Sequence, residues 1–144
     1  QLGSSGGGNH FVEFGEITLQ EKNVLNLPEG SYLALLSHSG SRGLGAAIAK
    51  HYSLLAREVC RLPREAQHFA WLDLNTEEGQ EYWMSMNLAG DYARACHERI
   101  HLNLAKALGL KPLANVNNHH NFAWKEEITP GRMAIVHRKG ATPA

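Results

Sequence analysis

The chain has 144 residues, 43% of them hydrophobic, and its 14 basic residues balance its 14 acidic residues. This length is typical of one compact domain, and the zero formal charge excludes a strong overall field, so a nucleic acid would have to be bound by a local cluster of cations. The sequence contains neither an apolar run of membrane-spanning length nor a signal segment, and its two cysteines form no CxxC pair. We therefore expect a soluble, cytoplasmic protein that does not enter a membrane.

The first half of the chain predicts two strands and a helix, followed by a third short strand. Residues 10–17 alternate apolar with polar or small side chains, which is typical of a strand. Residues 31–37 are nearly all apolar and predict a strand buried on both faces. After the glycine-rich run at 39–45, apolar residues at helical spacing predict an amphipathic helix over 44–60. Residues 68–72 predict a short strand.

The second half opens with the longest predicted helix. Thr76 precedes two acidic residues and is a good N-cap, and Gly109 is expected to end the helix. Apolar residues at steps of three and four predict one stripe that faces the core. The stripe comprises Tyr82, Met86, Ala89, Ala93, Cys96, Ile100 and Leu104.

Two further strands are predicted after this helix, over residues 113–118 and 132–138. Residues 122–124 lie between them, and Thr129-Pro130-Gly131 is expected to form a turn. The predicted class is therefore α+β.

A glycine-rich turn between a strand and a helix raises the possibility of a nucleotide-binding dehydrogenase. The run Gly40-Ser41-Arg42-Gly43-Leu44-Gly45 resembles a phosphate-binding turn, in which backbone N–H groups approach a pyrophosphate. However, Ser39 stands where the first glycine of that pattern belongs, and no Tyr-x-x-x-Lys pair occurs in the sequence. A glycine turn by itself is more often an ordinary tight connection between a strand and a helix.

The run His97-Glu98-Arg99-Ile100-His101 matches H-E-x-x-H on a predicted helix. A spacing of four places both imidazoles on one face, where they could bind zinc while Glu98 activates a water molecule. This predicts a zinc-dependent hydrolase, which would also need a third protein ligand. The alternative is that both histidines flank the core stripe and are partly exposed.

Four blocks in order along the chain support a third interpretation. The blocks are residues 6–13 (GGGNHFVE), 38–45 (HSGSRGLG), 120–126 (HNFAWKE) and 137–142 (HRKGAT), and residues 87–93 (NLAGDYA) lie between them. Together they resemble the signature blocks and the central helix of the RtcB RNA ligases. The resemblance implies a mixed α+β fold in which strands carry metal-site histidines beside a long central helix. The doubled His119-His120 and the ending KGATPA look closest to the shorter bacterial branch linked to a peptide-release-factor homologue.

The resemblance implies a centre of two manganese ions and a GTP site. His10, His38 and His120 stand where the family has histidine ligands, and each lies at the end of a predicted element or at a glycine-rich turn. For these three we expect convergence on one pocket, with His97 and His101 outside it. The nucleotide contacts implied by the family are Asn9, Phe11 and Glu13.

The same resemblance places Arg42 and Lys139 at the phosphate of an RNA end. A guanidinium can bind two phosphate oxygens and an ammonium adds a compact charge, so these residue types suit an anion clamp. The implied reaction begins when GTP guanylylates a histidine. GMP then passes to an RNA 3′-phosphate, which is first formed from any 2′,3′-cyclic phosphate, and a 5′-hydroxyl attacks the activated end.

Two blocks of the complete family pattern do not occur in these 144 residues. They are the His-Gly-Ala-Gly-Arg block that carries the guanylylated histidine, expected beyond Ala144, and an upstream Asp-x-x-Cys pair. Because the chain begins at Gln1 and ends without a closing helix, we expect residues 1–144 to be a single, partial, central segment of the ligase. The segment itself would then be a partial, non-catalytic binder of metal, nucleotide or RNA.

Overall fold

The computed structural model describes residues 2–142 and contains both helices and strands, which confirms the α+β class. The chain separates into two compact units, Gln1–Lys111 and Pro112–Ala144, which are described one at a time. That residues 1–144 belong to a single domain stays a prediction.

The first unit contains a long hairpin. Strands β1 (Phe11–Leu19) and β2 (Gly30–His38) are antiparallel, and Phe11 is the register partner of His38. The start of β1 and the end of β2 therefore lie side by side, which brings the first two predicted blocks together although 27 residues separate these two register partners.

Strand β2 is not buried on both faces, so that part of the sequence prediction is wrong. Leu33 is 67% exposed and Leu36 is 55% exposed. Within residues 2–142, β2 pairs with β1 alone and packs against one helix, α2 (Glu77–Leu108). Two-sided burial needs elements on both faces of a sheet, which these residues do not supply.

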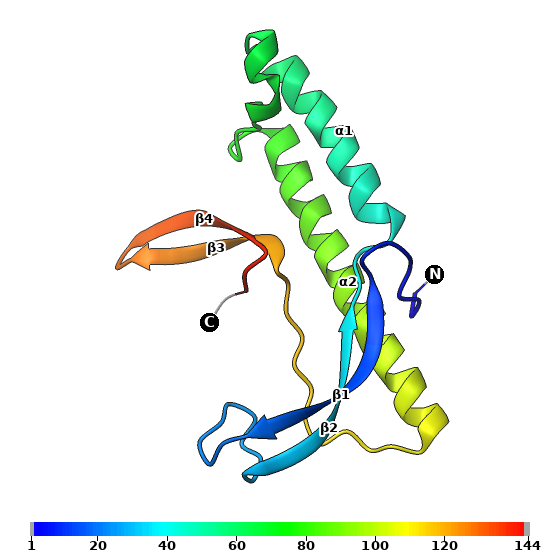
Figure 1. Cartoon of the computed structure of the whole chain (residues 1–144). Helices are drawn as coiled ribbons and strands as arrows, with labels where there is room; N and C mark the ends of the chain where they lie inside the picture. The colour runs from blue at the N-terminus through cyan, green and yellow to red at the C-terminus, as the bar shows by residue number, and fades with distance from the viewer. Residues whose placement is uncertain (1, 143–144) are drawn as a thin grey trace. The chain divides into compact units, whose positions relative to one another are not determined.

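Helices α1 (Gly43–Val59) and α2 pack along each other, as Figure 1 shows in cyan and green. The predicted N-cap is confirmed, because the Thr76 hydroxyl accepts a hydrogen bond from the Gly79 N–H at 3.2 Å. Gly109 ends α2 in the left-handed conformation, with φ 66°. The central part of the predicted stripe forms the core, and its buried members are Ala89, Ala93, Cys96 and Ile100. None of the helices in the described residues combines the length and apolarity that a membrane crossing needs.

The strand expected at 68–72 is absent, and a 3₁₀ helix, η1 (Arg64–Phe69), precedes that position and overlaps it. Pro63 fixes the backbone before η1, and its carbonyl accepts a hydrogen bond from Ala66 N–H at 2.9 Å. No other strand in residues 2–142 pairs with this segment, and an unpaired strand leaves backbone groups unsatisfied.

The second unit is built on the hairpin of β3 (Asn121–Thr129) and β4 (Arg132–Lys139), joined by the predicted turn at Pro130-Gly131. Two predictions are corrected here. Residues 122–124 belong to β3 rather than to a connection, and residues 113–118 form no strand. Phe122 and Trp124 are good strand residues once β4 is available as a partner, whereas 113–118 have none in the described chain.

Gly79 is expected to be a sensitive position in the first turn of α2. A Cβ at this position would overlap the backbone carbonyl of Asp73, which cannot move without distorting the turn before α2. Gly79→Ala should therefore lower the free energy of unfolding by roughly 2–4 kcal/mol. Gly43→Ala, where a Cβ would meet nothing within 4 Å, should stabilise by roughly 0.5 kcal/mol. Urea unfolding measures both, and equal effects would contradict the role of the clash.

Candidate metal and nucleotide site

The glycine-rich N-terminal segment is packed against the first unit. Gly3 N–H donates to the Cys96 thiol sulfur at 3.4 Å, and this sulfur lies 3.9 Å from the Ser4 carbonyl. The Ser5 carbonyl accepts from the Ser39 hydroxyl at 2.9 Å. These contacts connect the segment to α2 and to the turn after β2, and so place His10 beside that turn.

His10 and His38 lie next to each other at this point. Their ring centroids are 5.6 Å apart, with the rings nearly perpendicular. A metal–nitrogen bond is about 2 Å long, so two rings at this separation can share one ion. Nδ1 of His38 lies 3.0 Å from the Asn9 carbonyl, to which it donates in the neutral ring. The lone pair is then on Nε2, as in many metal-binding histidines.

Arg42 also lies next to His10, in the turn that opens α1. Its Nη1 donates to the Ser5 carbonyl at 2.7 Å and lies 3.3 Å from His10 Nδ1. A Cβ on Gly6 would overlap the guanidinium, so the glycine allows this close approach. The sequence prediction that Arg42 precedes a helix is confirmed, but the helix offers fewer free amides than expected. Ser41 accepts from the N–H groups of both Leu44, at 3.2 Å, and Gly45, at 3.1 Å.

The residues predicted to contact GTP extend from this cluster along β1. Asn9 supplies the carbonyl that binds His38, and the ring centroid of Phe11 lies 5.6 Å from that of His38. Glu13 is exposed and lies two residues beyond Phe11, on the same face of the strand. The structure thus brings Asn9 and Phe11 to the histidine pair, and their contacts with a nucleotide stay a prediction.

His120 and Lys139 lie at one end of the β3–β4 hairpin in the second unit. Lys139 is the register partner of Asn121, and the His120 carbonyl accepts from Ala141 N–H at 3.1 Å. Gly140 N–H donates to the Asn121 side chain at 2.8 Å. These contacts hold the third predicted metal ligand and the second predicted cation close together.

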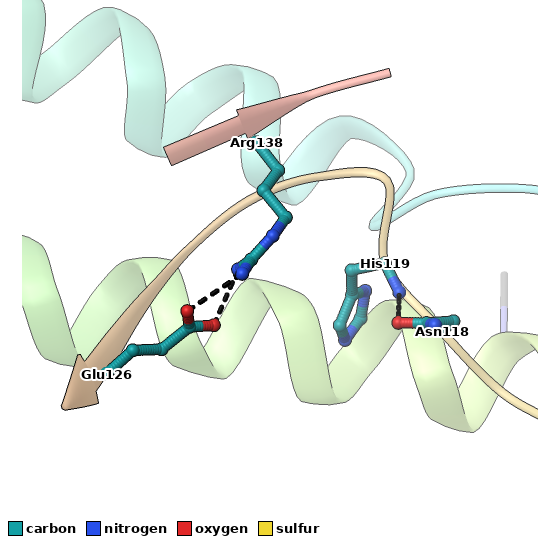
Figure 2. Close-up of polar contacts among 4 residues, drawn as sticks. All are labelled: Asn118, His119, Glu126 and Arg138. Atoms are coloured by element: carbon teal, nitrogen blue, oxygen red, sulfur yellow. Dashed lines mark hydrogen bonds and ion pairs between the residues drawn. The ribbon is translucent and has the colours of Figure 1, made fainter. Parts of the chain in front are cut away.

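An ion pair that the sequence analysis did not single out supports this hairpin. Figure 2 shows Arg138 of β4 directed at Glu126 of β3, with Nη1 2.5 Å and Nη2 2.8 Å from the two carboxylate oxygens. The guanidinium carbon also lies 5.0 Å from the centroid of the Trp124 ring. The hydrogen bonds from Arg138 lower the pKa of Glu126 and those to Glu126 raise the pKa of Arg138. Trp124 and Glu126 lie two residues apart and therefore on the same face of β3. This spacing was the sequence signal that could have predicted a cross-strand contact with Arg138.

Convergence of all three predicted metal ligands stays a prediction, because His10 and His38 belong to the first unit and His120 belongs to the second. The same holds for the clamp of Arg42 and Lys139. Within residues 2–142, no three or more His, Cys, Asp or Glu side chains are arranged to hold a metal ion. The histidine pair alone is a partial donor set, and imidazole nitrogens suit manganese, zinc and iron alike.

His97 and His101, the histidines of the H-E-x-x-H match, attach α2 to the end of β2. Nε2 of His97 accepts from Ser39 N–H at 3.1 Å, and Nε2 of His101 lies 2.9 Å from the Ser37 hydroxyl. Both rings are partly exposed. These contacts support the packing interpretation, and the zinc-hydrolase alternative lacks a third ligand among the described residues.

The turn at residues 39–45 connects a strand to a helix, as in a dinucleotide-binding fold, but the surrounding topology differs. β2 is antiparallel to β1 in a two-stranded sheet, whereas that fold needs parallel strands joined by crossover helices. The dehydrogenase alternative is therefore wrong for the part of the chain that the structure describes.

His101 is expected to make stability depend on pH. Burial, and secondarily the neighbouring His97, lower the pKa of His101 below its usual value of 6.5. Below that pH, His101 is protonated more readily in the unfolded chain than in the folded chain. The free energy of unfolding therefore falls as the pH falls below about 6.5. Urea unfolding at pH 7.5 and 5.5 should show a smaller loss for His101→Gln than for the original chain. The exposed His68→Gln is the control, and equal pH dependence in both variants would contradict the assignment.

The sequence model of the family described as tRNA-splicing ligase RtcB matches residues 1–144. The chain therefore belongs to the RtcB family. It is 32% identical to the tRNA-splicing ligase RtcB of Methanococcus maripaludis and 31% identical to that of Thermococcus kodakarensis, covering all of this chain and 34% of each relative. It is 29% identical to RNA-splicing ligase RtcB homolog 1 of Entamoeba dispar, covering all of this chain and 30% of that protein.

The chain spans only part of these relatives, from 17% of the Methanocaldococcus jannaschii protein to 34% of the Methanococcus maripaludis protein. Membership of the family thus rests on the whole chain, and the activity of the whole protein is a proposal. Placement in the bacterial branch stays a prediction.

Proposed function

We propose that this chain is the central segment of an RNA ligase and carries part of its manganese site, part of its GTP site and its contacts to RNA phosphate. The match to the RtcB family over the whole chain supports this proposal most directly. The gathering of His10, His38 and Arg42 agrees with it, since a metal-binding pair beside a guanidinium suits phosphoryl chemistry.

The proposed reaction joins an RNA 3′-phosphate or 2′,3′-cyclic phosphate to a 5′-hydroxyl at the expense of GTP. In this reaction water first opens any cyclic phosphate to a 3′-phosphate, and a histidine outside these 144 residues attacks the α-phosphate of GTP with release of pyrophosphate. GMP then passes from the histidine to the 3′-phosphate, and the 5′-hydroxyl displaces GMP. Bound manganese would neutralise phosphate charge and lower the pKa of a coordinated hydroxyl.

The residues of this chain have distinct proposed roles in binding. The Asn9 carbonyl orients His38 through Nδ1, so that Nε2 would be the nitrogen that binds the ion. His120 is the third proposed histidine ligand. Phe11 and Glu13 contact the guanosine, and Asn9 contacts its phosphates. Arg42 and Lys139 bind the phosphate of the RNA end.

A ligation assay with the complete enzyme tests the proposal. RNA with a 3′-phosphate and RNA with a 5′-hydroxyl should be joined only when GTP and manganese are both present. His38→Ala should abolish joining, because it removes a ligand that the Asn9 carbonyl orients. His51→Ala, which alters an exposed histidine on α1, should have no effect. Joining without GTP, or full activity of His38→Ala, would contradict the proposal.

A further inference from the structure

The contact between Arg42 and His10 fixes which nitrogen of the imidazole carries a proton. Nη1 of Arg42 lies 3.3 Å from Nδ1 of His10. Every guanidinium nitrogen is a donor and none is an acceptor, so Nδ1 has to be the acceptor. A neutral imidazole has a single ring lone pair in its plane, and the proton of His10 is therefore on Nε2.

A metal ion needs that same lone pair. If the ion binds Nδ1, it takes the lone pair that accepts from Arg42. If it binds Nε2, the proton has to move to Nδ1, and an N–H group then faces the N–H groups of the guanidinium. In both cases the hydrogen bond between Arg42 and His10 is lost.

We propose that metal binding at His10 and the Arg42–His10 hydrogen bond exclude each other, so that metal loading releases Arg42 for an anion. The inference rests on the proposed function for the role of His10 as a metal ligand and for the role of Arg42 as a contact to an anion. Metal binding and anion binding then favour each other, whichever comes first. By linkage, an anion that draws Arg42 away from His10 also strengthens metal binding by the same factor.

Two features of Arg42 support this inference, because they indicate a side chain that is held in place without partners for all of its hydrogen-bond donors. Its backbone has φ 59° and ψ −142°, a conformation that residues other than glycine rarely adopt. Its Nε is buried and has no hydrogen-bond partner among the described residues. An unsatisfied buried donor is costly, and an oxyanion at the Nε edge of the released guanidinium would satisfy it.

Nuclear magnetic resonance of the ¹⁵N-labelled chain tests the first half of the inference. Long-range ¹H–¹⁵N spectra of histidine rings distinguish the two tautomers. Without metal, His10 should carry its proton on Nε2 alone, and Arg42→Gly, which also relieves the backbone at φ 59°, should return His10 to the mixture of both tautomers that an unconstrained histidine shows. A proton on Nδ1 of His10 in the metal-free chain would overturn the inference. Titration with zinc, a diamagnetic probe, should shift the signal of whichever ring nitrogen binds the ion, and the hydrogen bond from Arg42 to Nδ1 should be lost in either case.

Electron paramagnetic resonance of free manganese tests the second half. Arg42→Gly should bind manganese about tenfold more tightly than the original chain, because no charged hydrogen bond has to be broken. The control is Arg57→Ala, which removes an exposed cation from the same helix and should change affinity far less. Equal affinities of the Arg42→Gly variant and the original chain would overturn the inference alone. Manganese binding that His10→Ala leaves unchanged would overturn the role of His10 as a ligand, and with it both proposals.

Discussion

Arg42→Ala in the complete ligase is expected to reduce RNA-end joining by roughly 10- to 150-fold in kcat/KM, the effect of losing one charged hydrogen bond to phosphate. Guanylylation with GTP should be nearly unchanged. The reason is spatial: Arg42 lies at the start of α1, whereas the residues expected to hold GTP follow β1 through Phe11 and Glu13. The two half-reactions are measured separately, with labelled GTP for the first and labelled RNA for the second.

The matched control for this prediction is Arg57→Ala, which removes a cation from the last turn of the same helix. It should leave both half-reactions close to those of the unaltered enzyme. Arg42→Lys separates charge from shape, because an ammonium cannot bind two phosphate oxygens in the fixed geometry of a guanidinium. If Arg42→Ala impairs guanylylation as much as joining, the residue holds the site together or contacts GTP, and its proposed role with RNA is wrong.

The 144-residue chain by itself is expected to form no covalent guanylate with GTP and manganese. None of its nine histidines lies in a His-Gly-Ala-Gly-Arg context, the block that the resemblance to the family predicts for the guanylylated histidine. Moreover, the described residues hold no group of three or more metal-binding side chains that would orient GTP for attack. Incubation with GTP labelled in the α-phosphate, followed by a denaturing gel, measures this directly.

The positive control for guanylylation is the complete enzyme, which should be labelled under the same conditions. A labelled band from the 144-residue chain would mean that one of its own histidines substitutes as the nucleophile. His10→Ala and His38→Ala would then identify it, since these two rings lie beside the expected nucleotide residues.

Local signals were sufficient to predict most elements of this fold. Thr76 and Gly109 marked the ends of α2 because capping depends on residues within one turn of the helix. The strand at 113–118 and the two-sided burial of β2 were wrong, because both depend on distant partners. A run of apolar residues indicates that a segment can be a strand, whereas pairing and burial depend on what the rest of the chain places beside it.

The residues of the candidate site could be predicted from the sequence, whereas the contacts that support them could not. Resemblance to a family placed His10, His38 and Arg42 at one site, and the hairpin register explains how residues so far apart in the sequence meet. The supporting contacts were not visible in the sequence. The Ser39 hydroxyl donates to the Ser5 carbonyl beside the site, and the Ser39 N–H donates to His97 of α2. No rule of sequence spacing predicts both contacts for one serine.

The packing of the N-terminal segment over Cys96 has a chemical consequence. The thiol is fully buried, and the sulfur contacts the backbone of Gly3 and Ser4, so a reagent reaches it only when the segment lifts away. The rate of alkylation at Cys96 is therefore governed by local opening of the segment that leads to His10, whereas the partly exposed Cys60 reacts without such opening. The alkylation rate of Cys96 relative to that of Cys60 therefore reports how often the glycine-rich segment leaves the site.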